Sequence, residues 1–193
     1  NNIVLKNILI RTELLPQLSK NPLIFYKYSI QESDTPEIIA DKYYGDSYRY
    51  WMVLYGNPNI MDPQADWPLN AQQFVIYLND KYATAANGSA NVLAYTQGTV
   101  HHYEKIITTT DSTTGTTAVK NIEVDFNTYS AITPYTRARI FSDGSTVTYS
   151  VSASIVSIYT YELNLNESKR NIKILNSQYV SQFETEFSNL MAA

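Results

Sequence analysis

Hydrophobic and polar residues follow two different periods along the chain, so the sequence predicts both strands and helices. Residues 23–30, LIFYKYSI, are rich in aromatic and β-branched side chains and predict a strand. The QESDTPE that follows predicts a helix start, with Thr35 as N-cap and Pro36 at the first helical position. Gly45 is placed to end this helix. The pattern therefore begins with a strand and a short helix.

Two more short helices are expected before residue 85. The first is expected to begin at the N-cap Ser47 and to end at Gly56. The apolar residues of this helix lie at i, i+3 and i+4: Trp51, Leu54 and Tyr55. Residues 57–69 contain three prolines and predict an ordered loop. Asn70 and Gln73 then form an N-x-x-Q capping pattern. The apolar face of the helix that follows consists of Phe74, Leu78 and Tyr82.

The composition changes after residues 83–91, ATAANGSAN, which are small and uncharged and predict an internal boundary or linker. From residue 92 to 165 the chain is rich in Thr, Ser, Tyr and Val and predicts a β region. Its apolar residues alternate at Ile122, Val124 and Phe126, and again at Val147, Tyr149 and Val151. DSTTGTT and SDGST predict the turns, and the second contains the hairpin dipeptide Asp143-Gly144.

The last segment predicts an amphipathic helix, because Tyr179, Phe183 and Phe187 recur at i+4 spacing. Its aromatic stripe could face the core of the domain or a partner protein. The core interpretation is favoured, since apolar stripes of helices usually face a core.

Residues 1–22 are apolar but contain Pro16 and Pro22, so they predict an arm that needs a surface to pack on. Lys6 and Arg11 interrupt the apolar stretch, and no signal peptide is expected. No apolar run approaches the roughly 20 residues that span a bilayer, so no membrane anchor is expected either.

These elements predict an α+β fold. An αβ module is followed by a β-rich antiparallel region and a C-terminal amphipathic helix. The expected segments are an N-terminal arm at 1–22, the αβ module at 23–84, the β-rich region at 85–165 and the C-terminal helical segment at 166–193.

Composition narrows the function classes. The 193 residues include no Cys, which excludes disulfides, thiol nucleophiles and cysteine-based metal sites. A net charge of -4 gives no basic face for nucleic acid or an anionic membrane. Charged residues make up 17% of the chain against about 25% in typical domains, while 17 residues are Tyr. Tyr enrichment is typical of protein interfaces, and equally of a Tyr-rich β domain.

No residue pattern indicates a catalytic or metal site. His101 and His102 are adjacent in a predicted strand, where neighbouring side chains point to opposite faces, so a structural role is favoured over a shared metal. The acid pairs Glu37 with Asp41 and Asp62 with Asp66 could suit glycoside hydrolysis, but roles on a helix surface and in a turn explain them as well. No cofactor is expected, and the chain is not predicted to be an enzyme.

The segment YSIQESDTPEIIADKYYGDSYRYWMVLYGNPNI resembles a LysM module: a strand, the D-T pair, an I-A pair in the first helix and N-P after the second. More specifically, YYGD, Trp51 in the second helix and the extension DPQADWPL resemble the baseplate wedge subunit family of contractile-tailed, T-even-like bacteriophages. Two further segments, VHHYEKIITT and ESKRNIKILNSQYVSQFETEF, resemble the same family.

The resemblance implies a structural component of the tail baseplate wedge that contacts neighbouring wedge subunits and helps join wedges around the central hub. It implies other wedge proteins as partners, together with sheath-initiator or tube-proximal proteins, and about six copies in a sixfold-symmetric assembly. The implied location is the virion tail baseplate, assembled in the host cytoplasm.

Two other functions stay open at this point: a peptidoglycan-binding LysM module that takes N-acetylglucosamine polymers, and a cell-wall hydrolase. The usual Gly before D-T is Ser33 here, which argues against carrying over the sugar site. For the wedge protein, the candidate partner-interface residues are Trp51, Asp62, Pro63, Trp67, Tyr179, Phe183 and Phe187.

Overall fold

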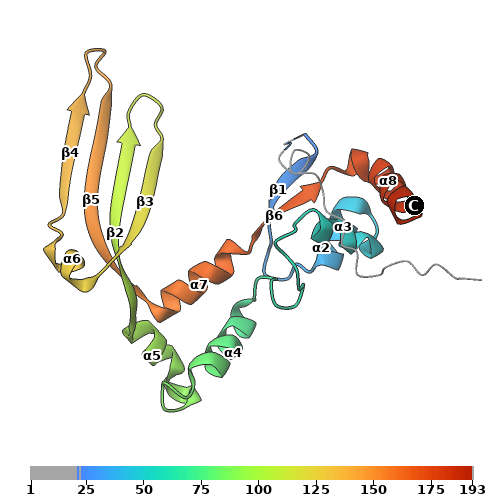
Figure 1. The fold of residues 1–193 in the computed structure, drawn as a ribbon, viewed down its shortest axis with the longest axis horizontal. Helices are drawn as coiled ribbons and strands as arrows, with labels where there is room; N and C mark the ends of the chain where they lie inside the picture. The colour runs from blue at the N-terminus through green and yellow to red at the C-terminus, as the bar shows by residue number, and fades with distance from the viewer. Residues whose placement is uncertain (1–20, 22, 193) are drawn as a thin grey trace, which may run out of the picture. The chain divides into compact units, whose positions relative to one another are not determined.

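The computed structural model describes residue 21 and residues 23–192, and within them the fold is α+β, as the sequence predicts (Figure 1). Most of the predicted N-terminal arm lies outside the described residues. Contacts divide the chain into two compact units, residues 1–74 with 166–193 and residues 75–165. We call them unit 1 and unit 2 and describe each by itself. The division into four segments at 22, 84 and 165 stays a prediction.

Unit 1 is built on a two-stranded antiparallel sheet whose strands are far apart in the sequence. Strand β1 (Phe25–Ser29) pairs with β6 (Asn171–Leu175), with Phe25 opposite Leu175 and Ser29 opposite Asn171. Helices α2 (Pro36–Tyr44) and α3 (Tyr50–Tyr55) lie between them in chain order, with the 3₁₀ turn η1 (Ser47–Arg49) before α3. The chain ends with the 3₁₀ turn η3 (Ser177–Tyr179) and helix α8 (Val180–Ala192).

The core of unit 1 forms where these elements converge. Its fully buried side chains include Ile39 from α2, Met52 from α3 and Ile174 from β6. Burying side chains of this size supplies about 1.5–3 kcal/mol each relative to exposure. The hydrophobic core therefore joins the start and the end of the chain.

The predicted signals at α2 are confirmed. The Thr35 side chain accepts a hydrogen bond from the Ile38 amide at 3.3 Å, and Pro36 begins the helix. Gly45 has a left-handed φ of 68° and its amide donates to Asp41 O at 3.0 Å, which closes the helix end.

Ser47 was expected to cap the next helix, and that prediction is wrong. Asp46, one residue earlier, caps the 3₁₀ turn η1 that precedes α3, and its carboxylate accepts a hydrogen bond from the Tyr48 amide at 2.9 Å. Asp and Ser cap helices about equally well, so the sequence alone does not choose between neighbours. The chain then passes through a 3₁₀ turn before α3 begins.

A buried amide joins α3 to the sheet. Asn57 donates through Nδ2 to Val53 O and to Lys173 O, both at 2.7 Å, and its Oδ1 accepts from the Lys173 amide at 2.8 Å. The side chain thereby pairs with both backbone groups of a β6 residue, as a neighbouring strand would. Removing it would leave buried backbone groups without partners, which costs about 1–3 kcal/mol per group.

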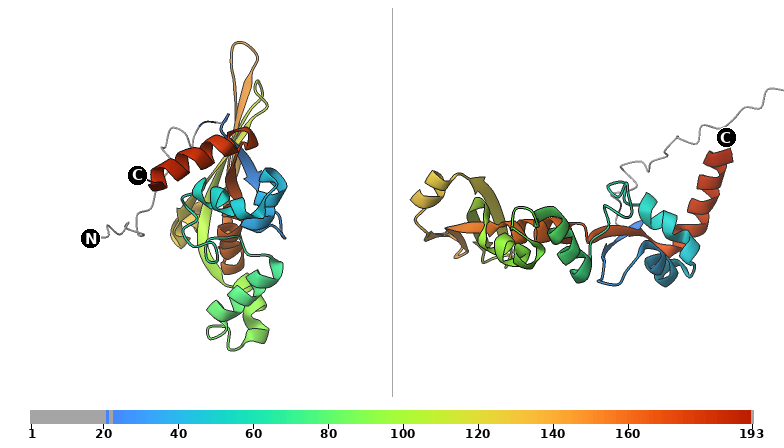
Figure 2. Two further views of the ribbon diagram at one scale, coloured as in Figure 1. Left: turned by 90° about the vertical axis from the view of Figure 1, so that its right-hand side faces the viewer. Right: turned by 90° about the horizontal axis from the view of Figure 1, so that it is seen from below.

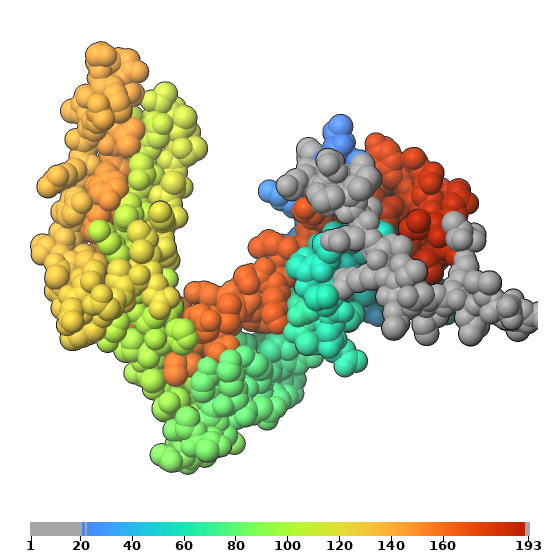
Figure 3. Space-filling view, in the orientation of Figure 1, coloured from blue at the N-terminus to red at the C-terminus, as the bar shows by residue number. Residues whose placement is uncertain are grey.

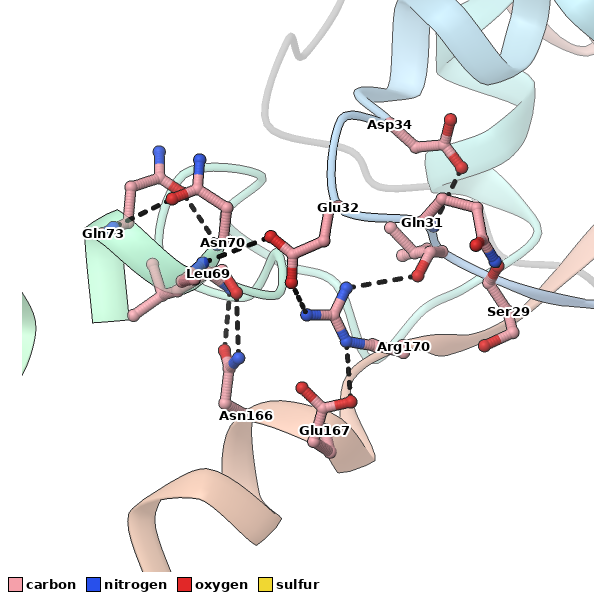
Figure 4. Close-up of polar contacts among 12 residues, drawn as sticks. Ser29, Gln31, Glu32, Asp34, Leu69, Asn70, Gln73, Asn166, Glu167 and Arg170 are labelled. Atoms are coloured by element: carbon pink, nitrogen blue, oxygen red, sulfur yellow. Dashed lines mark hydrogen bonds and ion pairs between the residues drawn. The ribbon is translucent and has the colours of Figure 1, made fainter. Parts of the chain in front are cut away.

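A second polar network fastens the loop before α4 (Ala71–Tyr82) and the end of α7 (Ile158–Ser168) to unit 1 (Figure 4). Arg170 contacts Glu32 at 3.0 Å and Glu167 at 2.8 Å. The Asn166 side chain exchanges two hydrogen bonds with the backbone of Leu69, at 2.7 and 2.9 Å. The predicted capping pattern also lies here and is confirmed by two reciprocal bonds between residues 70 and 73.

Helix α8 packs its aromatic stripe on α3 within the same chain, as the core interpretation expected, and both views place the two helices side by side (Figure 1 and Figure 2). Phe183 stacks on Trp51 with ring centroids 5.8 Å apart and meets Tyr55 edge-on at 5.5 Å. Arg49 adds an ion pair to Glu184 at 2.8 Å. Aromatic contacts therefore hold the C-terminal helix in unit 1.

Unit 2 contains a four-stranded antiparallel sheet in the order β3-β2-β5-β4. Its strands are β2 (Val100–Asp111), β3 (Thr117–Val124), β4 (Tyr135–Ile140) and β5 (Thr146–Ser157). Both predicted turns connect neighbouring strands, and Gly144 takes the left-handed φ of 83° that its turn requires. The predicted β region thus consists of two antiparallel hairpins, β2–β3 and β4–β5, whose inner strands β2 and β5 pair with each other.

The same region contains helices that the sequence did not predict. They are the 3₁₀ turn η2 (Ser89–Asn91), α5 (Val92–Gly98), α6 (Phe126–Ala131) and most of α7. Phe126 was expected to continue the alternation of Ile122 and Val124, but it begins α6. The Asp125 carboxylate, accepting from the Thr128 amide at 2.9 Å, caps the helix and ends the strand.

A buried carboxylate fastens α7 to α4 inside unit 2. Glu162 is only 3% exposed and accepts hydrogen bonds from Lys81 Nζ at 2.8 Å, Tyr82 Oη at 2.6 Å and Tyr77 Oη at 2.9 Å. Burial by itself raises the pKa of Glu162, but the hydrogen bonds from Lys81 and the two tyrosines outweigh it and hold the pKa below its ordinary value. The ionised form is therefore the stable one in the fold.

We expect Phe183→Ala to lower the free energy of unfolding of unit 1 by about 2 kcal/mol, roughly half the usual cost of deleting a fully buried Phe, because Phe183 is half-buried. Both tryptophans lie in unit 1, so their fluorescence during urea unfolding measures this loss. Ser188→Ala, an exposed change on the same helix, is the control and should shift stability by less than about 0.5 kcal/mol. Equal stability of the two variants would show that the aromatic contacts do not support unit 1.

Glu162→Gln should destabilise unit 2 by about 1–3 kcal/mol at pH 7, because the buried donors lose a charged acceptor. Since the folded pKa of Glu162 is lowered, its contribution is fully present above the ordinary Glu value of 4.5 and is lost as pH falls through the folded pKa. The advantage of the unchanged protein over Glu162→Gln should therefore be constant near neutrality and shrink below pH 4.5. Urea unfolding followed by circular dichroism at several pH values measures it, with the exposed Glu123→Gln as control.

Candidate interaction surfaces

The structure brings together some of the seven candidate interface residues and separates the others. Trp51, Phe183 and Phe187 form one aromatic cluster between α3 and α8, with the Trp51 and Phe187 rings 4.6 Å apart. Tyr179 packs against the same core from the turn before α8. The cluster is half-buried and therefore serves packing inside the chain as well as any contact outside it.

The other three candidates belong to the loop between α3 and α4. Trp67 packs against the core and donates through Nε1 to Asp34 O at 2.9 Å. Asp62 and Pro63 are exposed, and Asp62 Oδ1 accepts from the Gln64 amide at 2.9 Å. Trp67 therefore anchors the loop, whereas the 62–63 tip is open to contact.

A groove opens in unit 1 beside the aromatic cluster, with a cavity volume of about 730 Å³. One wall is α8, with Phe183, Phe187 and Leu190; the other includes Ile24 and Phe25 at the start of β1. Tyr55 of α3 lines it as well, and Asn21 stands at its edge. We call this cavity the α8 groove. The sequence pattern predicted its helical wall but not the groove, since the opposite wall comes from the other end of the chain.

The sheet of unit 2 has two chemically different faces, which follow from the strand register. On the face that we call the Tyr149 face lie Tyr103, Lys105, Ile107, Lys120, Ile122, Val124, Tyr135, Arg137, Arg139, Val147, Tyr149, Val151 and Ile155. The opposite face, the Ser150 face, carries mostly Ser and Thr, including Thr108, Thr110, Thr148, Ser150, Ser152 and Ser154. Apolar and aromatic side chains are therefore concentrated on one side.

The Tyr149 face is only partly covered by unit 2 itself. Helix α6 reaches Tyr103, whose ring lies 4.7 Å from Tyr129 and 5.5 Å from Phe126. The space-filling view shows side chains of the strands at the surface of unit 2 (Figure 3). Most side chains of the four strands are half-buried or exposed, and of the residues on them only Val151 and Val156 are buried.

The Tyr149 face is also cationic, although the net charge of -4 predicted no basic face. It carries Lys105, Lys120, Arg137 and Arg139 against one carboxylate, Asp111. The Arg137 guanidinium lies 5.0 Å from the centre of the Tyr135 ring, so part of this charge is held against an aromatic side chain. Tyr and Arg are the residue types that protein interfaces favour.

The adjacent histidines differ from the expectation that they point apart. A register shift between Val100 and His102 breaks the strand alternation, and His101 Nδ1 lies 2.8 Å from His102 Nδ1. His101 stacks on Tyr161 with centroids 3.7 Å apart, and His102 Nε2 lies 3.3 Å from Glu104 Oε1. Within residues 21 and 23–192, no group of three or more side chains is placed to hold a metal ion.

The acid pairs lie on a helix surface and in a loop. Glu37 and Asp41 are both exposed on α2. Asp66 accepts hydrogen bonds from the backbone amides of Asp62 at 2.9 Å and Met61 at 2.8 Å, and these bonds lower its pKa. Its carboxylate closes the loop, because both bonds come from that loop's own backbone.

Asp34 directly precedes Thr35, the N-cap of α2, and its side chain joins three parts of unit 1. Its buried carboxylate accepts from Tyr28 Oη at 2.5 Å, Lys42 Nζ at 2.6 Å and the Gln31 amide at 2.9 Å. Burial raises the pKa of Asp34, but the bonds from Lys42, Tyr28 and Gln31 outweigh it and lower the pKa overall. An acid held in its ionised form by three donors is a structural anchor.

Two comparisons with known proteins bear on identity. The family model described as base plate wedge protein 53 matches residues 19–190, which include the described part of unit 1 up to residue 190 and the whole of unit 2. A search among curated proteins gave no match. Among the described residues, no helix has both the length and the apolar character needed to cross a membrane. The chain therefore belongs to the base plate wedge protein 53 family and is a structural protein of the phage tail baseplate.

Proposed function

We propose that this chain is a non-catalytic subunit that contacts neighbouring wedge proteins and helps join wedges around the central hub during tail assembly. Membership of a baseplate wedge family supports a role in assembly. The observation that carries the proposal is the incompletely covered Tyr149 face of unit 2. A neighbouring subunit would supply its missing second layer.

The physical reason lies in how sheets are stabilised. A sheet with one apolar face normally buries that face against another layer of structure. In unit 2 α6 covers part of this face around Tyr103, and Ile155 remains 51% exposed. Aromatic rings and guanidinium groups there offer large contact areas and directed hydrogen bonds, which suits an apolar surface rimmed with carboxylates on the partner.

Within the same proposal, the partners are other wedge proteins and sheath-initiator or tube-proximal proteins, and the chain is present in about six copies. A subunit repeated around a sixfold axis makes the same contact with each neighbour, which closes a ring. The exposed tip at Asp62 and Pro63 is a second contact surface in this proposal. The other five candidates are half-buried and in this proposal pack beneath the contact surface of unit 1: Trp51, Trp67, Tyr179, Phe183 and Phe187.

We also propose that β1, α2, α3 and β6 form a LysM-like module. The order strand, helix, helix, strand and the antiparallel pairing of β1 with β6 support this. Three elements fall within the predicted segment 23–84, and the last strand comes from residues 171–175. A likeness of fold carries no sugar-binding function by itself. Nothing in the comparisons supports peptidoglycan binding.

Ile155→Lys should weaken binding to neighbouring wedge subunits, because it places a charge in the apolar part of the Tyr149 face. A loss of one to two kcal/mol corresponds to roughly 5- to 30-fold weaker binding. Co-expression with the other wedge proteins of the same phage, followed by affinity purification and titration of the complex, measures the loss.

Ile140→Lys is the matched control, since Ile140 is an equally apolar residue of the same sheet, 74% exposed, on the Ser150 face. Its binding should stay within about twofold of the unchanged protein. Both free variants should show the circular dichroism of the unchanged protein. Equal loss of binding in both, or in neither, would contradict the assignment of the Tyr149 face.

A further inference from the structure

The α8 groove is an apolar cavity without an occupant among the described residues of the chain. Its walls include Leu23, Phe187 and Leu190, and both Leu23 and Leu190 are exposed. A groove of this volume is in the range that protein pockets use for ligands of several large side chains. The groove lies beside Asn21, so the segment that precedes Asn21 is the nearest candidate occupant.

The sequence immediately before the groove is strongly apolar. Residues 1–20 precede Asn21, which lines the groove, and nine of these twenty residues are Ile, Val or Leu. Leu14, Leu15 and Leu18 are the nearest of them. The segment carries three cations, Lys6, Arg11 and Lys20, and one carboxylate, Glu13, while Glu186 stands on the α8 wall of the groove. Polarity and charge are therefore complementary.

We propose that the α8 groove is the docking site for this chain's own N-terminal segment, with Leu14, Leu15 and Leu18 as its anchors. The docked segment covers the exposed edges of the aromatic cluster and completes unit 1. This inference is independent of the proposed contacts with other wedge subunits.

The lengths of chain and groove agree. The α8 wall from Val180 to Leu190 rises about 15 Å along the helix. Leu14 precedes Asn21 by seven residues, which reach up to about 25 Å when extended. Leu14 and Leu15 can therefore reach any point of the groove, while Leu18, three residues from Asn21, reaches up to about 10 Å from that residue.

Docking within the same chain is favoured over docking of a second copy. A segment joined to the groove edge by a few residues has an effective concentration in the millimolar range. A second copy would have to exceed that concentration in solution to compete. The segment of the same chain therefore fills the groove at the micromolar concentrations of ordinary measurements.

The absence of cysteine from the chain allows a direct test with introduced thiols. In Leu190→Cys the thiol lies in the groove, and in Leu93→Cys it lies on α5 with nearly the same exposure, 54% against 53%. Alkylation of Leu190→Cys should be about tenfold faster after deletion of residues 1–20, because the docked segment excludes the reagent. Alkylation of Leu93→Cys should not change with the deletion. A synthetic peptide of residues 1–20 added to the shortened chain should restore protection.

The outcomes separate the alternatives. Equal alkylation of Leu190→Cys with and without the segment would overturn the proposal. Protection that increases with protein concentration would assign the groove to a second copy instead, and would overturn docking in the same chain. Tryptophan fluorescence reports whether unit 1 stays folded, because Trp51 and Trp67 both lie in it. If the deletion unfolds unit 1, Leu190→Cys alone reacts faster, and the full-length variant Leu14→Ser/Leu15→Ser/Leu18→Ser replaces the deletion.

A cross-link in the full-length chain gives an independent answer. The pair Leu15→Cys with Leu190→Cys should form a disulfide within one chain under mild oxidation. The pair Leu15→Cys with Met61→Cys, whose second thiol lies on the exposed loop of the same unit, should not. Equal cross-linking of both pairs, or of neither, would contradict docking in the groove.

Discussion

The pairing of β1 with β6 is the constraint on which unit 1 depends. Ile30 and Arg170, which continue the ladder at one end, are 140 residues apart in the sequence. Closing so long a connection costs little more than closing a short one, since a threefold longer loop adds only about 1 kcal/mol. Once the strands pair, Asn57 and the core side chains of α3 can pack on β6. The apolar wall provided by α8 then follows, because that helix begins five residues after the strand.

Unit 2 lies between β1 and β6 in the sequence and is stabilised in a different way. Its strands all come from one continuous stretch of the chain, so its topology needs no segment from outside the unit. What the unit lacks is a full layer to cover its sheet, and a sheet alone gains little stability from burial. The buried network around Glu162 and the contacts of α6 hold its helices. A protein that functions in an assembly can leave the remaining apolar face for its neighbours.

Local chemistry was predictable from the sequence, and long-range pairing was not. The cap at Thr35, the end at Gly45 and the turn at Gly144 depend on neighbouring residues, and all three are confirmed. The role of Asn57 depends on Lys173, 116 residues away, and no local pattern indicates it. Among the candidate interface residues, spacing grouped Phe183 with Phe187, but their packing on Trp51 required the fold.

Helices in the β region were missed for a different reason. Ile158–Ser168 mixes β-branched, aromatic and polar residues, and intrinsic propensity does not separate helix from strand there. Tertiary contact decides, since Glu162 needs three donors from α4 on one side of a helix. The histidine pair shows the same limit, because a bulge of one residue reverses which face a side chain occupies.

The abundance of Tyr has two physical explanations in this chain, and both follow from its amphipathic side chain. Tyr28, Tyr77 and Tyr82 donate to the buried carboxylates Asp34 and Glu162, and burial together with the bond to Glu162 raises the pKa of Tyr82 to about 12. Such phenols keep their protons at neutral pH and serve as donors to a buried charge. Tyr135 and Tyr149 instead lie on the open face of the sheet. Tyr thus replaces charged residues in both places, since it supplies a hydrogen bond inside the fold and contact area outside it without a cost of desolvating charge.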